Sequence, residues 1–128
     1  MTARVQNAGL AGITGAIAAY TTLPKYLQWG TSNNAAAGAT AVTTTTTTEA
    51  RATGVVTQQT TTVTNDTYQI VGTLTAAETL TISEVGVFDG AGTGSPPTGS
   101  NMWFYGDFDN VGLTSGDSIT FTVQTKFS

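Results

Sequence analysis

The stretch Asp117-Ser-Ile-Thr-Phe-Thr-Val-Gln-Thr-Lys-Phe127 decides the fold of this chain. From Ile119 onward its odd positions are apolar, with Thr125 the one exception, and its even positions carry hydroxyl, amide or amine side chains. This alternation is typical of a β-strand with one buried face and one solvated face. We therefore predict a strand here and look for others that share the pattern.

A second strand is predicted over Thr67–Thr75, just after the turn residues Asn65-Asp66. Its apolar side chains on one face are Tyr68, Ile70 and Leu74. A third is predicted over Leu80–Phe88, where the apolar residues change from even positions (Leu80, Ile82) to odd ones (Val85, Val87). A strand keeps one face buried through such a change only if a β-bulge absorbs a residue. We predict a bulge or bend near Ser83-Glu84.

The remaining strands are marked by the turns around them. Residues 89–101 are rich in Gly and Pro, which predicts a long exposed hairpin loop. Met102–Phe108 reads as the strand after it, with Asp109-Asn110 as the next turn, and residues 51–63 as a further strand or pair of strands. Short strands separated by turn signals indicate an all-β domain. We expect an antiparallel, jelly-roll-like β-sandwich over residues 46–128.

Residues 1–45 are expected to form an N-terminal arm. They are rich in small residues and carry no clear strand pattern. Ala8–Tyr20 fits a short helix, although its glycines weaken the helix, and it also fits an extended arm lying on another subunit. The six threonines of Thr43–Thr48 are expected to be extended, because β-branched side chains disfavour helix.

Composition excludes several classes of function. The chain has 128 residues, which fits one domain, and a net charge of −4, which argues against a nucleic-acid surface. Its longest apolar stretch is too short to span a membrane. Without His or Cys it lacks the commonest general base, metal ligand and thiol nucleophile. We expect a protein that is not an enzyme and that needs no cofactor. Its 29 threonines and few charges favour repeated association.

Asp107 and Asp109 are the strongest candidates for chemistry. Two residues apart on a strand, they share a face, so they could act as paired carboxylates or bind calcium with Asn110 and Asp89. Carboxylates beside a turn more often bond to their own backbone. We therefore predict no metal site.

Trp29, Trp103 and Tyr105 are the candidate partner-contact residues, since large aromatic side chains are favoured at protein interfaces. Trp29 is also interpreted as a plug in the domain core. Trp103 points away from Met102 and Phe104, which suggests a strand covered on both faces. A different class, a carbohydrate-binding module, would use Trp103 and Tyr105 as sugar platforms.

Several short strings carry a family resemblance. They are Pro24–Thr31, Glu49–Arg51, Thr64–Gln69 with Gly72-Thr73, Ile82–Asp89 and Gly116–Ile119. Together they resemble small virion proteins of tailed bacteriophages, over residues 24–128. None of the strings is a catalytic motif.

The resemblance implies a capsid cement, or decoration, protein. Such a protein would sit on the outer surface of the virion as a homotrimer and stabilise the shell by bridging major capsid protein subunits. The alternative within the same resemblance is a tail-fibre, tail-tip or baseplate component, in which loop 89–101 would carry recognition.

Overall fold

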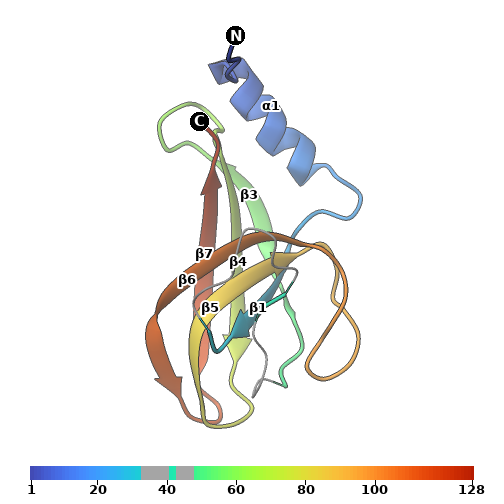
Figure 1. The fold of residues 1–128 in the computed structure, drawn as a ribbon, viewed down its shortest axis with the longest axis vertical. Helices are drawn as coiled ribbons and strands as arrows, with labels where there is room; N and C mark the ends of the chain where they lie inside the picture. Colours follow the sequence, from blue (N-terminus) through green and yellow to red (C-terminus); the bar gives the residue numbers. More distant parts are fainter. Residues whose placement is uncertain (33–40, 43–47) are drawn as a thin grey trace.

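The computed structural model describes residues 1–32, 41–42 and 48–128 (Figure 1). Its elements, in chain order, are α1 (Asn7–Ala18), β1 (Tyr26–Gly30), β2 (Ala52–Thr53), β3 (Val55–Gln59), β4 (Thr67–Thr75), β5 (Leu80–Phe88), β6 (Met102–Leu113) and β7 (Ser118–Lys126). The predicted boundary at residues 45 and 46, and most of the Thr43–Thr48 run, lie outside the described residues.

Two antiparallel sheets pack face to face, which confirms the predicted all-β sandwich. One sheet has the strand order β2-β1-β5-β6 and the other the order β3-β4-β7. In Figure 1 the strands β5 and β6 cross in front of β4 and β7. The core lies between the sheets and is built from β1, β4 and β5, with Leu27, Tyr68, Ile70, Ile82 and Val87 fully buried.

The chain passes from one sheet to the other at Gly54, between β2 and β3. A Cβ atom at this position would lie 2.4 Å from Cγ2 of Ile70 and 2.9 Å from Cδ1 of Leu27. Only glycine therefore allows the two sheets to approach this closely at the crossing.

The bulge predicted at Ser83-Glu84 is confirmed. The pairing of β5 with β6 shifts between Ile82 and Glu84, so that residues 108–110 of β6 lie opposite Ser83 alone. This shift is what lets both Ile82 and Val85 face the core. The turn predicted at Asp109-Asn110 is wrong, because both residues lie in the bulged part of β6, which continues to Leu113.

The N-terminal region differs from a wholly extended arm. Of the two alternatives for Ala8–Tyr20, the structure has the helix, α1, at Asn7–Ala18. Tertiary contacts hold it: Leu10 is 5% exposed, and the Thr14 hydroxyl donates to the carbonyl of Asn65 at 2.6 Å. Tyr26–Gly30 is an inner strand of the four-stranded sheet, so the sandwich includes residues that were expected in the arm. Within the described ranges, no helix is long and apolar enough to cross a membrane.

Candidate partner-contact surface

An exposed aromatic pair lies where the end of α1 meets β6. Trp103 is 41% exposed and Tyr20, two residues after α1, is 53% exposed. Their ring centroids are 5.9 Å apart with the planes tilted by 50°. Two large aromatic side chains in contact at the surface are typical of a binding site. The sequence pointed to Trp103, but nothing in the pattern around Tyr20 indicated this pairing.

Asp89 fixes the orientation of Trp103. Its Oδ2 atom accepts from the indole Nε1 at 3.1 Å and from Nδ2 of Asn101 at 2.8 Å, and its Oδ1 atom accepts from the Asn101 backbone at 2.8 Å. Partial burial acts to raise the pKa of Asp89, but these hydrogen bonds outweigh it and hold the pKa below its ordinary value. The Asp89 carboxylate is therefore charged at neutral pH, and its hydrogen bond orients the Trp103 indole.

Arg51 anchors the adjoining loop, residues 89–101, from beneath. It is 7% exposed, and its Nη1 atom donates to the carbonyls of Gly90 at 2.8 Å and Gly99 at 3.0 Å. Its Nε atom donates to Oε1 of Gln28 at 2.8 Å. Burial lowers the pKa of Arg51 while Asp89 raises it, and the guanidinium stays protonated. A buried cation bonded to both ends of a loop makes that loop rigid.

The loop itself is shaped to receive this guanidinium. Gly92 has a φ of +71°, and a Cβ atom there would lie 2.8 Å from the Thr98 carbonyl and 3.0 Å from Nη1 of Arg51. Thr93 and Thr98 exchange backbone hydrogen bonds at 2.9 Å, closing the tip of the loop. The result is an exposed loop whose conformation is fixed before any partner arrives.

The three predicted contact residues have different fates. Trp29 is 1% exposed and packs edge-on against Phe121. The prediction that Trp29 contacts a partner is therefore wrong. Its alternative interpretation, as a large side chain that fills the domain core, is confirmed. Trp103 is exposed, as a contact residue requires. Tyr105 is half-buried, and its hydroxyl donates to Oε2 of the buried Glu84 at 2.8 Å.

Asp107 and Asp109 are both exposed on β6. Among the residues that the structure describes, no three His, Cys, Asp or Glu side chains gather in a way that could hold a metal ion. Asp89, another of the candidate calcium ligands, joins no such group among these residues.

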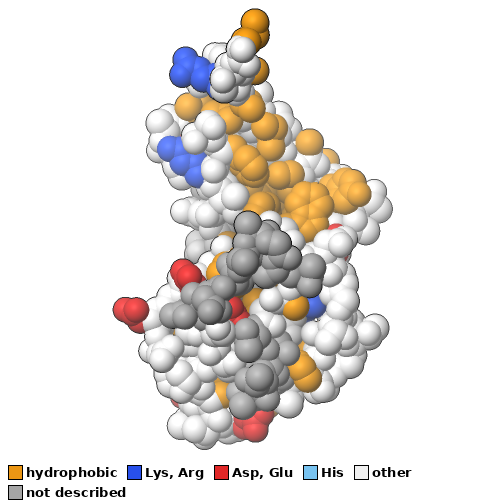
Figure 2. Space-filling view, in the orientation of Figure 1, with side chains coloured by type: hydrophobic (Ala, Val, Ile, Leu, Met, Phe, Trp, Pro, Cys, Tyr) orange, Lys and Arg blue, Asp and Glu red, His pale blue; other side chains and the backbone are white. Residues whose placement is uncertain are grey.

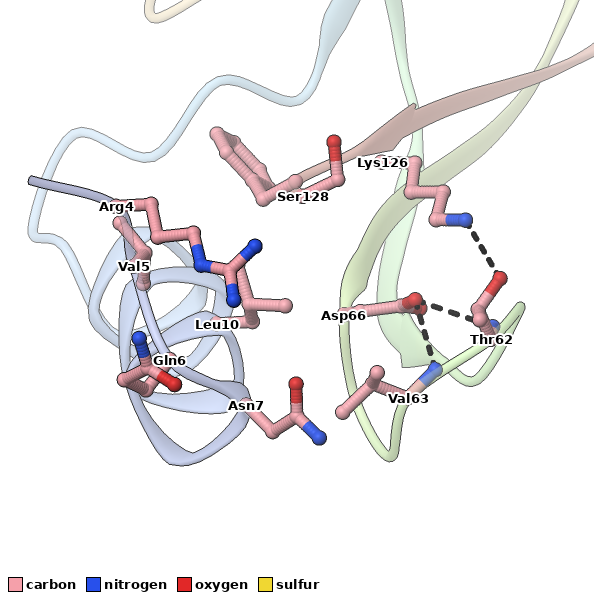
Figure 3. Close-up of a pocket in the computed structure, with 11 residues that line it drawn as sticks. Arg4, Val5, Gln6, Asn7, Leu10, Thr62, Val63, Asp66, Lys126 and Ser128 are labelled. Atoms are coloured by element: carbon pink, nitrogen blue, oxygen red, sulfur yellow. Dashed lines mark hydrogen bonds between the residues drawn. The ribbon is translucent and has the colours of Figure 1, made fainter. Parts of the chain in front are cut away.

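A cavity of about 280 Å³ lies between the start of α1, the loop before β4 and the C-terminus (Figure 3). Among the described residues that line it, Asp66 is the one acidic side chain, and Arg4 and Lys126 are the cations. The Asp66 carboxylate bonds to its own loop. Its Oδ2 atom accepts hydrogen bonds from the backbone N–H groups of Thr62 at 3.1 Å and Val63 at 3.0 Å. The Asp66 carboxylate therefore has a structural role, because it holds the loop before β4 in its conformation. Its position in the cavity wall does not indicate a bound ligand.

Comparisons with protein-family models, with curated proteins and with solved structures find no match to this chain.

Proposed function

We propose that this chain is a bacteriophage virion protein of the capsid cement type, which binds the outer surface of the shell by bridging major capsid protein subunits. It acts by binding alone, as a structural protein and not as an enzyme. The homotrimer that the resemblance implies stays a prediction. The observation that carries the proposal is the outer face of α1.

That outer face lacks the polar side chains of an ordinary surface helix. The chain has no charged residue between Arg4 and Lys25. Leu10 and Thr14 face the three-stranded sheet, while Ala8, Gly12 and Ala16 are exposed on the opposite side. A helix that is apolar on all sides is typical of one that is buried on all sides. A partner surface therefore suits the exposed side.

Figure 2 shows hydrophobic side chains gathered along α1 and continuing to the segment after it. This band leads to the Tyr20–Trp103 pair, where the one neighbouring carboxylate that bonds to the pair, Asp89, accepts from the Trp103 indole. Burying the α1 part of this surface against a capsid subunit removes apolar area from water without desolvating a charge, because the helix carries none.

The second candidate, a tail-fibre or tail-tip component that binds a receptor, is favoured by loop 89–101. The loop is exposed, and Arg51 fixes its shape. A rigid loop binds with a smaller loss of conformational entropy than a mobile one. Copy number separates the two candidates, since a cement protein covers the shell in many copies and a tail component is present in few.

The test is the substitution Gly12→Glu. A Cβ atom at Gly12 has nothing within 4 Å, and Glu has a higher helix propensity than Gly, so α1 should stay folded. We expect the charge to lower the number of copies per purified phage particle at least about tenfold, which corresponds to about 1.4 kcal/mol of binding free energy. Quantitative gel densitometry against the major capsid protein measures it.

The matched control is Thr81→Glu, which adds the same charge at an exposed position of β5. It should leave the copy number unchanged. Unreduced incorporation of Gly12→Glu would contradict a contact through α1. Absence of the chain from purified particles would contradict the virion assignment itself.

A further inference from the structure

β7 ends the three-stranded sheet as a long, regular edge strand. All nine of its residues pair with β4 in a single uninterrupted register, from Ser118 opposite Thr75 to Lys126 opposite Thr67. In the part of the chain that the structure describes, no strand lies on its other side. Figure 1 shows β7 along this margin, and the start of α1 comes near it only at the Lys126 end.

Two other edge strands, β6 and β3, carry features that protect an edge from further pairing, and within the described ranges β7 carries none. β6 is interrupted by its bulge and carries the exposed Asp107 and Asp109. β3 has only five residues, and its Gln58 side chain bonds to the carbonyl of Ala11 in α1 at 3.2 Å. β7 has no proline and no bulge, and its one charge, Lys126, is its last residue. Proteins normally block edges of this length against further pairing.

The inner face of β7 is also incompletely covered. Ile119, Phe121 and Val123 point into the sandwich but are only half-buried. On the adjacent β4, Ile70 and Leu74 are 0% and 4% exposed. One more strand beside β7 would cover its apolar residues as β7 covers those of β4.

We propose that a second copy of this chain supplies that strand, with the two β7 strands pairing antiparallel about a two-fold axis at Thr122. The two three-stranded sheets would then join into one sheet of six strands. The contact is isologous, because both subunits use the same strand. Each residue of β7 lies opposite the residue of the partner strand that is equally far from Thr122 on the other side of it.

The sequence of β7 fits itself in this register. Thr122 meets Thr122 of the partner subunit, and Phe121 meets Val123 of the partner subunit on the inner face. On the outer face Lys126 meets Ser118 of the partner subunit, so the two lysines lie about 27 Å apart, well beyond the screening length at physiological salt. A β6–β6 contact would instead bring four carboxylates together at one edge, and like charges across a strand pair are destabilising.

Two charge substitutions at Thr122 test the contact on the full chain. Thr122 is exposed on the outer face, so Thr122→Lys and Thr122→Glu should each fold, but each places two like charges opposite one another at the axis. Light scattering after size exclusion should give the wild type an even multiple of the 13.1 kDa chain mass. Each variant alone should show half the wild-type mass.

An equimolar mixture of the two variants should recover the wild-type mass, because Lys then faces Glu. That recovery also shows that both variants are folded. Thr81→Lys, the same change on β5, should keep the wild-type mass. A monomeric or purely trimeric wild type would overturn the proposal, as would a Thr122→Lys variant with unchanged mass. None of these outcomes depends on virion binding, so the two-fold contact and the proposed function stand or fall separately.

Discussion

The guanidinium carbon of Arg51 lies 3.6 Å from the ring centroid of Phe88, so a buried cation stacks directly on the last residue of β5. Phe88 is 0% exposed and Arg51 is 7% exposed, so the stack is largely shielded from water. Cation–π contacts are stronger when desolvated. The Arg51–Phe88 stack connects the end of β5 to loop 89–101, because the same guanidinium donates hydrogen bonds to the carbonyls of Gly90 and Gly99.

We expect Arg51→Ala to lower the free energy of unfolding by about 2–4 kcal/mol, because it leaves Gln28 and two loop carbonyls without their buried donor. Urea denaturation followed by circular dichroism measures this. Arg4→Ala is the control, since Arg4 is exposed and should change the stability by less than about 0.5 kcal/mol. Equal stability of the two variants would show that Arg51 does not hold the loop.

Gly54→Ala should destabilise the sandwich by about 1–3 kcal/mol, because the new methyl group would overlap Ile70 and Leu27 where the sheets are joined. The same change at Gly106 of β6 is the matched control. A Cβ atom there meets nothing within 4 Å, so Gly106→Ala should be neutral or slightly stabilising. Thermal unfolding of both variants in parallel decides the point, and a harmless Gly54→Ala would mean that the crossing can widen.

The strands that could be predicted are those whose burial follows local alternation. Thr67–Thr75 and Leu80–Phe88 have the bounds of β4 and β5, and the parity change at Ser83-Glu84 located the bulge. In these segments each residue's face is set by its immediate neighbours, so a single sequence carries the information.

The features that were missed depend on distant partners. Gly54 reads as an ordinary loop glycine until Ile70 and Leu27 are seen to close on it. The helix α1 is held by packing on β3 and β4 and not by its own propensity. Arg51 bonds to backbone carbonyls, which no side-chain pattern reveals.

Acid should destabilise the protein through Asp66. Burial acts to raise the pKa of Asp66, but hydrogen bonds from the backbones of Thr61 and Val63 and from the Thr67 hydroxyl outweigh it and hold the pKa well below its ordinary value. A depressed pKa in the folded state gives stability that is present above the unfolded value of about 3.9 and is lost as the pH falls below it. Urea midpoints measured down to about pH 2 should therefore decrease steadily below about pH 4.

Asp66→Asn isolates this contribution. It should be less stable than the wild type at neutral pH, with a shallower loss of stability in acid, because the group that titrates has been removed. Asp109→Asn, a change on exposed β6, leaves the Asp66 loop intact and should keep the wild-type acid sensitivity. If Asp66→Asn lost stability in acid as steeply as the wild type, other carboxylates would be responsible.

Alkali should destabilise the protein through Tyr68. Its side chain is 0% exposed and its hydroxyl donates to the carbonyl of Pro24 at 3.0 Å. Burial raises the pKa of Tyr68 to about 12. The folded state therefore favours the neutral phenol, and the stability this gives is complete below the unfolded pKa of about 10 and is lost as the pH rises toward about 12.

Tyr68→Phe keeps the buried ring and removes the ionisable group, so its stability should fall less between about pH 10 and about pH 12 than that of the wild type. Removing the hydroxyl also takes away the hydrogen bond to the Pro24 carbonyl, which should lower the free energy of unfolding by about 1 kcal/mol at neutral pH. Tyr20→Phe is the control, because Tyr20 is 53% exposed and its ring contact with Trp103 does not need the hydroxyl. Chemical denaturation at several alkaline pH values separates the two variants. Identical alkaline slopes for Tyr68→Phe and the wild type would mean that Tyr68 ionises only after the sandwich has opened for another reason.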